Sequence, residues 1–310
     1  MEKGTVGSPI QVNLQGDTYH ICVCICTYKR ERLLEHLLVK LQSQRTEDLF
    51  TYSIVVVDND HDLSAQRVVE DLAARSRIKI DYYVEPVKHV ALARNKAVLN
   101  AQGDFVALID DDEWPVEDWL LHLYRAYRKY NPDGVLGPVR EHFEEDPPKW
   151  IIRAKLWERK TYSTGHTLHW EETKTGNCLL RKSIFHDHRN LFDPRFAHGE
   201  DKDFFRRMMS KGLKFIWSNE ALVYETCLPD RFKKSFYLKR ALLRGSISFR
   251  HRHYNYLMIV RSVIGCSVYT LSLPILLLFS FSQFMKYLIR DCDHIGRLLM
   301  AYGIDIGKYL

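Results

Sequence analysis

The chain has 310 residues, and its hydrophobic content of 46% supplies a folded core, which excludes a largely disordered protein. The net charge of +6 and the isoelectric point near 8.8 favour an anionic partner, either a phosphate-bearing ligand or an acidic lipid surface. Nucleic acid is not expected as a partner, because no zinc finger, basic zipper or RNA-recognition signature is present. Residues 1–18 lack the apolar run of a secretory signal and are expected to form a flexible tail.

Strands and helices are predicted to alternate through the first half of the chain. Short apolar runs indicate buried strands at 19–26, 52–57, 78–84 and 105–109. Helical patterns occur at 31–44, 64–75, 90–101 and 119–130. This alternation predicts an α/β fold, with a mostly parallel sheet and right-handed crossovers. The pattern weakens at 149–175, which is typical of an active-site flap, and then short strands are expected at 177–180, 215–217 and 222–224, with a helix at 201–211.

The cysteines of the first predicted strand are expected to be free thiols. Cys22, Cys24 and Cys26 alternate, so their side chains share one face of the strand, with successive Cα atoms about 7 Å apart. That separation is too large for a disulfide. No pair of cysteines has the C-x-x-C spacing that indicates zinc, so a reducing compartment is favoured.

The C-terminal part of the chain has the composition of a membrane-associated region. A strongly basic stretch at 231–252 leads into residues 262–284, which carry no charge and as a helix would span roughly 34 Å. We expect a basic helical membrane-proximal region at 229–261, a transmembrane or re-entrant segment at 262–289 and an amphipathic basic tail at 290–310. A buried core helix is the alternative, and Pro274 is the expected bend of a re-entrant hairpin.

Carboxylates follow two of the predicted strands. The run Asp110-Asp111-Asp112-Glu113 ends one strand, and Asp58 ends another. Because the carboxyl ends of parallel strands meet at one edge of a sheet, both groups are expected to border one cleft. Clustered carboxylates repel each other, and a divalent cation relieves that repulsion.

The turn after the first strand is expected to contact a nucleotide without a glycine cradle. Residues 26–30 contain no glycine, which excludes the dinucleotide and P-loop fingerprints. The hydroxyl of Thr27 and the charge of Arg30 are the groups available for the contact.

Eight blocks of sequence together resemble the family 2 glycosyltransferases with the GT-A fold, and most of all the succinoglycan-biosynthesis glucosyltransferase group. In chain order they are CICTYKR at 24–30, VVVDND at 55–60, ALARN at 91–95, GDFVALIDDDEW at 103–114, VLGPVR at 135–140, TGNCLLRK at 175–182, GEDKDFF at 199–205 and KRALLRG at 239–245. The resemblance implies a GT-A catalytic domain over 19–228.

The resemblance also implies a nucleotide-sugar donor and a role for each acidic group. Asp110-x-Asp112 matches the DxD motif, so Asp112 is expected to bind Mn²⁺ or Mg²⁺ between the donor phosphates, with Asp110 near the ribose. Asp58 is expected to accept a hydrogen bond from the base, which suits the N3–H of uracil. A cap on the helix that follows is the alternative role for Asp58. Arg94 is expected near the phosphates or the sugar, and Asp111 and Glu113 as supporting neighbours.

The segment Gly199-Glu200-Asp201 matches the catalytic block of the family, which makes Asp201 the expected general base. An acceptor hydroxyl needs a positioned carboxylate to take its proton. Asp201 also suits the first turn of a helix, where the dipole favours an acid, and this simpler reading stays open.

The remaining expected site residues concern the acceptor or the diphosphate. They are Gly176, Asn177, Glu200, Arg240 and Arg244. Gly176 and Asn177 are equally compatible with a plain turn. The spacing of Arg240 and Arg244 puts them on one helix face, and a face that is simply exposed to solvent is the alternative to a binding role.

One departure from the family pattern affects the metal site. Many relatives carry a histidine, a candidate third metal ligand, where this chain has Tyr224. Glu225 or water is then expected to complete the coordination.

The whole sequence indicates an inverting, metal-dependent hexosyltransferase on the cytoplasmic face of the inner membrane. UDP-glucose is the expected donor, and a polyprenyl-diphosphate-linked oligosaccharide is the expected acceptor in exopolysaccharide or surface glycan synthesis. Membrane lipids are the other expected partner. A nucleotidyltransferase that makes the nucleotide-sugar and a non-catalytic membrane scaffold are the alternatives.

Overall fold

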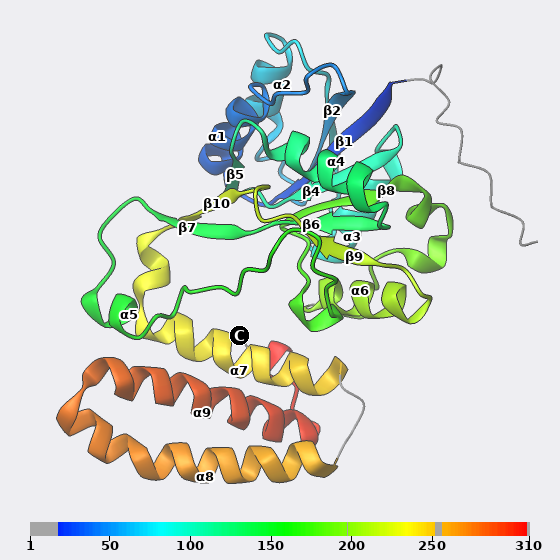
Figure 1. Ribbon diagram of the computed structural model, residues 1–310. Helices are drawn as coiled ribbons and strands as arrows, with labels where there is room; N and C mark the ends of the chain where they lie inside the picture. The colour runs from blue at the N-terminus through cyan, green and yellow to red at the C-terminus, as the bar shows by residue number, and fades with distance from the viewer. Residues whose placement is uncertain (1–17, 197, 252–255, 309–310) are drawn as a thin grey trace, which may run out of the picture.

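The computed structural model describes residues 18–196, 198–251 and 256–308 (Figure 1). Two β-sheets with their surrounding helices come first in the chain, and a stack of three long helices follows. Apart from Thr18, the expected N-terminal tail lies outside the described residues, as do the last residue of the basic stretch and the last two residues of the chain.

The main sheet has seven strands in the order β3-β2-β1-β4-β8-β6-β9. The strands are β1 (Tyr19–Thr27), β2 (Phe50–Asp58), β3 (Ile80–Val84), β4 (Phe105–Ile109), β6 (Gly134–Leu136), β8 (Asn177–Arg181) and β9 (Phe215–Trp217). The first four strands are mutually parallel, and β8 runs antiparallel between β4 and β6. The predicted mostly parallel α/β fold is confirmed.

Helices cover both faces of this sheet because alternate strand residues are apolar on both sides. Ile21, Val23 and Ile25 pack with α1 (Glu31–Leu41), α2 (Gln66–Ala73) and α4 (Trp119–Tyr130). Cys22 and Cys24 face the other way, toward α3 (Val90–Asn100) and α6 (Glu200–Ser210). All seven cysteines are free, as predicted for the three in β1.

A second sheet of three short strands was not predicted. It consists of β5 (Glu113–Pro115), β10 (Val223–Cys227) and β7 (Val139–Phe143), with β10 in the middle. β5 pairs antiparallel with β10, and this register places Glu225 opposite Glu113. The peptide N–H of Thr226 also donates to the carbonyl of Asp112 at 2.7 Å. The second sheet therefore brings two distant acidic segments together.

Helices α7 (Lys234–His251), α9 (Phe281–Ala301) and α8 (Tyr256–Phe279) lie side by side, with α9 between the other two (Figure 1). Short connecting elements are α5 (Lys149–Arg153) and the 3-10 turns η1 (Trp170–Glu172), η2 (Lys182–His186), η3 (His188–Asn190), η4 (Pro229–Phe232) and η5 (Ile306–Lys308). By length and composition α8 could cross a membrane, and almost none of its apolar stretch is buried within the described protein.

The chain reverses at Ser280, so the prediction of a bend at Pro274 is wrong. Pro274 lies inside α8, whereas the Ser280 hydroxyl accepts a hydrogen bond from the Gln283 N–H and caps α9. A proline removes one helical hydrogen bond, but a polar cap determines where a new helix begins.

Two glycines let the backbones of α7 and α9 touch. A Cβ atom on Gly296 would lie 2.1 Å from the carbonyl oxygen of Leu242, and one on Gly245 would lie 2.1 Å from that of Asp293. We expect Gly296→Ala to destabilise the fold by about 1–3 kcal/mol, because the helices must separate to admit the methyl group. Thermal unfolding measures this. Gly307→Ala is the matched control, since its nearest contact would be 3.3 Å, and an equal loss in both variants would contradict the close helix contact.

Candidate active site

The acidic run after β4 is held by groups from the end of β1, from the residue before α1 and from the 3-10 turn η4. Asp111 accepts hydrogen bonds from the Thr27 hydroxyl and from Arg30, both at 2.8 Å. Asp112 Oδ2 accepts a 3.1 Å hydrogen bond from Arg30 and also pairs with Arg231. The two expected nucleotide-contacting residues of the turn between β1 and α1, Thr27 and Arg30, therefore also shape the carboxylate loop.

A cleft of about 530 Å³ lies over this loop, where β1, β2 and β4 end. Its lining includes most of the residues expected to bind the donor, together with residues of α7. The lining residues are Cys26, Thr27, Tyr28, Arg30, Asn59, Val90, Ala93, Arg94, Asp110, Asp111, Asp112, Glu225, Arg231, Phe236 and Arg240.

Arg94 connects the acidic run to the start of α6. It pairs with Glu200, and its Nη2 lies 3.3 Å from Asp110 Oδ1. Burial alone would lower the pKa of Arg94, but the charges of Glu200 and Asp110 raise it. These ion pairs hold the first turn of α6, which contains Asp201, beside the cleft.

Three carboxylates of the run, those of Asp111, Asp112 and Glu113, are buried, whereas Asp110 is partly exposed. Burial, followed by the charge of Asp110, raises the pKa of Asp112 to about 6, and Arg231 opposes the shift. Burial and the neighbouring carboxylates also raise the pKa of Glu113 well above its usual range. Glu113 is 5% exposed and accepts a hydrogen bond from the Asp110 N–H, so it supports the loop from behind.

The donor atoms of this loop suit a hard divalent cation. Asp110 Oδ2 and Asp112 Oδ1 accept no hydrogen bond from any residue that the structure describes, and both residues line the cleft. Carboxylate oxygens of this kind are the ligands that Mg²⁺ and Mn²⁺ prefer. Both carboxylate oxygens of Glu225, in contrast, accept hydrogen bonds: Arg231 donates to Oε1 and Arg159 donates to Oε2. Tyr224, where the resemblance led us to expect a histidine, stacks on Trp114 with ring centroids 4.5 Å apart.

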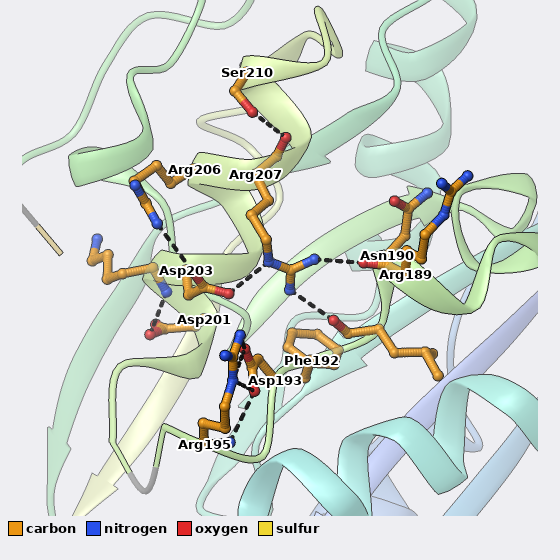
Figure 2. A network of polar contacts seen from close by, with 12 residues as sticks. Arg189, Asn190, Phe192, Asp193, Arg195, Asp201, Asp203, Arg206, Arg207 and Ser210 are labelled. Atoms are coloured by element: carbon orange, nitrogen blue, oxygen red, sulfur yellow. Dashed lines mark hydrogen bonds and ion pairs between the residues drawn. The ribbon is translucent and has the colours of Figure 1, made fainter.

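Asp201 lies in the first turn of α6, next to a firmly anchored part of that helix (Figure 2). Asp203 is bound by Arg206 and Arg207, and Arg207 also donates to two backbone carbonyls of the preceding loop. Asp201 Oδ1 accepts the neighbouring N–H of Lys202 at 2.7 Å. This environment is compatible with Asp201 as a positioned general base. It is equally compatible with Asp201 as an acidic residue that the helix dipole stabilises in the first turn.

The structure corrects the expected role of Asp58. The residue has no exposed surface, and its oxygens accept hydrogen bonds from the N–H groups of Asp60 and Ala65 and from the Tyr82 hydroxyl. These bonds fix the loop after β2. Because its oxygens are buried, Asp58 does not contact a base in this conformation. Its neighbour Asn59 lines the cleft instead.

The expected acceptor residues have different surroundings. The Asn177 amide accepts from Trp119 at 2.8 Å and donates to the carbonyls of Pro138 and Ala221, so it fastens the two sheets together. Gly176 makes room for the acidic run, since a Cβ there would lie 2.7 Å from Glu113 Oε1.

Of the two expected cations on α7, only Arg240 lines the donor cleft. Arg244 forms a two-pronged ion pair with Asp293 of α9, at 2.8 and 2.6 Å. The structure therefore assigns Arg244 first to the contact between the helices.

Sequence reasoning found Arg30 and Arg94 but missed two further arginines that pair with the site carboxylates. Arg231 was recognised only as part of a basic stretch, and Arg159 was not singled out. Arg231 lies 119 residues from Asp112, and no local motif indicates that pair. Only the short second sheet, which brings Glu225 beside the acidic run, would have shown it.

A larger pocket of about 800 Å³ lies on the other side of β10. It combines aromatic rings, carboxylates and cations from the second sheet and the flap. The lining residues are Leu136, Gly137, Pro138, Val139, Arg140, Glu141, Glu158, Arg159, Lys160, Thr161, Tyr162, His169, Glu171, Glu172, Lys174, Asn177, Trp217 and Tyr224.

Known proteins are similar to this chain in sequence and in architecture. The profile of Glycosyl transferase family 2 matches residues 22–189. Succinoglycan biosynthesis protein ExoM of Rhizobium meliloti is 32% identical over 75% of this chain and 75% of that protein. Glucosyl-dolichyl phosphate glucuronosyltransferase of Haloferax volcanii is 25% identical, over 53% of each chain.

Solved structures agree on the fold. S. aureus TarS 1-349 in complex with UDP-GlcNAc superposes with a TM-score of 0.53 at 15% identity, and the match covers 91% of this chain and 92% of that one. The profile match spans more than half of the chain, and it coincides with the sheet that carries the acidic run. The chain therefore belongs to glycosyl transferase family 2 and has the GT-A fold.

Proposed function

We propose that this enzyme transfers a hexose, with inversion, from a UDP-sugar to a hydroxyl of a lipid-linked oligosaccharide during bacterial exopolysaccharide or surface glycan synthesis. The principal observation is the cleft lined by Asp110 and Asp112, each of which has one carboxylate oxygen that accepts no hydrogen bond from a described residue. The ExoM relative supports the pathway class, and the UDP-GlcNAc complex of TarS supports the donor class. UDP-glucose is the specific donor we propose.

Each site group has a distinct task in this proposal. Asp112, with Asp110 beside it, would hold Mn²⁺ or Mg²⁺, which offsets the charge of the leaving diphosphate. Arg30 and Arg94 border the phosphates and add fixed positive charge. Asp201 takes the proton from the acceptor hydroxyl as the new bond to the anomeric carbon forms.

The acceptor glycan suits the larger pocket beside β10. Tyr162, Trp217 and Tyr224 supply ring faces for the apolar sides of sugars, and Glu141 and Glu158 supply hydrogen-bond acceptors for hydroxyls. This pocket adjoins the donor cleft through β10, whose Glu225 lines the cleft and whose Tyr224 lines the pocket.

We also infer that α8 attaches the enzyme to the cytoplasmic face of the inner membrane by lying along the bilayer. α9 packs along α8 and also along the cationic helix α7. A crossing orientation of α8 would carry charged groups such as Arg244 and Asp293 into hydrocarbon. An in-plane orientation places the exposed apolar side of α8 among acyl chains and keeps α7 in water.

We expect the triple change Leu271→Gln, Leu278→Gln and Phe279→Gln to release the protein from lipid vesicles while its thermal midpoint changes little. These side chains are 77%, 83% and 83% exposed, so they contribute little to the protein core. Vesicle co-sedimentation measures the release. Val39→Gln, at a 50% exposed apolar position on α1, is the control. Undiminished sedimentation of the triple variant would contradict attachment through α8.

The proposed reaction is tested by UDP release from UDP-glucose, with and without Mn²⁺, in the presence of a lipid-linked oligosaccharide. Metal-dependent release with a glycosylated product is expected. Formation of nucleotide-sugar from a nucleoside triphosphate would indicate the nucleotidyltransferase alternative. Absence of turnover with every nucleotide-sugar would leave the scaffold reading.

A further inference from the structure

A third cavity, of about 360 Å³, lies between α7, α9 and the loop at 154–159. Tyr237, Arg240 and Arg244 of α7 follow each other at spacings of three and four residues, so they share one helix face. Lys286, Ile289, Arg290 and Asp293 lie at positions i, i+3, i+4 and i+7 of α9, so they also share one helix face. These two faces oppose each other across the cavity, which Lys174 and the loop close.

Cations dominate this cavity. Its charged lining consists of Lys155, Arg159, Lys174, Arg240, Arg244, Lys286 and Arg290 against Glu158 and Asp293. Carboxylates neutralise three of the cations: Asp293 pairs with Arg244, Glu158 with Lys155 and Glu225 with Arg159.

Four cations of the cavity, Lys174, Arg240, Lys286 and Arg290, form no ion pair with a carboxylate of the described part of the chain. Arg240 and Arg290 lie over the rings of Phe236 and Tyr287, which orient a guanidinium group without using its N–H donors.

The electrostatics of Lys174 are consistent with this excess of positive charge. Its side chain is exposed to the cavity, yet the protein atoms around the ammonium group and the charge of Arg159 lower its pKa to about 8. Arg240 and Lys202 act in the same direction, and Glu225 opposes them. A bound anion would relieve this repulsion.

The cavity is placed between the proposed membrane helix and the reaction site. Arg240 lines both the cavity and the donor cleft, and Arg159 and Lys174 line both the cavity and the larger pocket. On its other side, only α9 separates the cavity from α8, a distance of roughly 8–10 Å between packed helix axes.

We propose that this cavity binds the diphosphate group that joins the acceptor glycan to its lipid. The inference rests on the proposed function and deepens it, because it gives the lipid-linked acceptor its own anion site. The lipid tail would lie along α8, the diphosphate among the four unpaired cations, and the glycan in the larger pocket.

The test is calorimetric titration of the full chain with farnesyl diphosphate, inorganic pyrophosphate and UDP. The double variant Lys286→Gln, Arg290→Gln is expected to bind farnesyl diphosphate about 100-fold more weakly, at roughly tenfold per lost charged contact. Its affinity for UDP in the donor cleft should not change. The control Lys214→Gln, Arg67→Gln removes the same charge from exposed positions far from the cavity and should leave both affinities unchanged.

The pH dependence offers a second readout. Lys174 is charged below its pKa of about 8, so farnesyl diphosphate should bind the wild type more weakly as pH rises through that value. Lys174→Met should bind more weakly at neutral pH and lose this dependence. An unchanged pH profile in Lys174→Met would contradict the direct contact.

The outcomes separate the inference from the proposed function. Equal weakening in the cavity and control variants would overturn the diphosphate site. Equal affinity for pyrophosphate and farnesyl diphosphate would overturn the lipid as the source of the phosphates. If the wild type transfers sugar while the cavity variants bind farnesyl diphosphate normally, only this inference fails. If farnesyl diphosphate binds as expected but no nucleotide-sugar is turned over, the proposed function fails instead.

Discussion

The variant Asp201→Asn is expected to bind the UDP-sugar donor normally and to lose sugar transfer by roughly 10²–10⁴-fold, the range that a general base contributes. An amide is close to a carboxylate in shape, so the first turn of α6 should persist, but an amide cannot take the acceptor proton. Donor affinity by calorimetry and transfer by product formation separate the two effects.

The matched control is Asp71→Asn, which removes the same charge from an exposed position on α2, beside Arg67. It should leave transfer unchanged. If Asp201→Asn transfers sugar at a rate near that of the wild type, Asp201 is a residue of the helix start stabilised by the dipole, and the base must be sought elsewhere.

The variant Asp112→Ala is expected to weaken Mn²⁺-dependent donor binding by roughly 100-fold or more. Changes to residues that merely orient metal ligands already cost about 10–100-fold, and a lost ligand should cost at least as much. The change also removes one carboxylate partner from Arg30 and from Arg231, and these guanidinium groups are then expected to hold some metal-independent affinity for the diphosphate. Calorimetric titration of UDP with Mn²⁺ and with a chelator measures both contributions.

The control for this variant addresses a second acidic cluster. Asp60, His61 and Asp62 present ligand atoms within 4.8 Å of one another at the end of β2. Asp62→Ala alters that cluster while leaving Asp112 intact, and Asp62 is 60% exposed. If Asp62→Ala removes the Mn²⁺ dependence and Asp112→Ala does not, the metal role assigned to Asp112 is refuted.

Six of the seven strands of the main sheet could be predicted, because most of them are buried on both faces, whereas the three-residue strand β6 was not predicted. The apolar runs that end at Asp58 and Ile109 have no polar alternation, and glycines, turns and charged residues separate them from the helices. The second sheet could not be predicted, since β5 has only three residues and offers too little pattern to recognise.

The site could be predicted only in part, for a related reason. A strand that ends in Asp110 and Asp112 indicates carboxylates at the edge of a sheet, and that much is local information. The burial of Asp58 is not local, because it depends on Tyr82 of a neighbouring strand. Likewise the partners of Glu225 come from the flap and from the 3-10 turn η4, which only tertiary packing brings together.

The pairing of β5 with β10 has a mechanical consequence. Thr226 holds the backbone of Asp112, and only the short η4 turn separates β10 from α7. Gly245 and Gly296 press α7 against α9, on which α8 lies. The acidic loop is therefore connected to the apolar helix α8 through a strand pairing, a short turn and helices packed against one another. Tension or curvature acting on α8 would therefore displace the donor site slightly, because the packed elements between them move together.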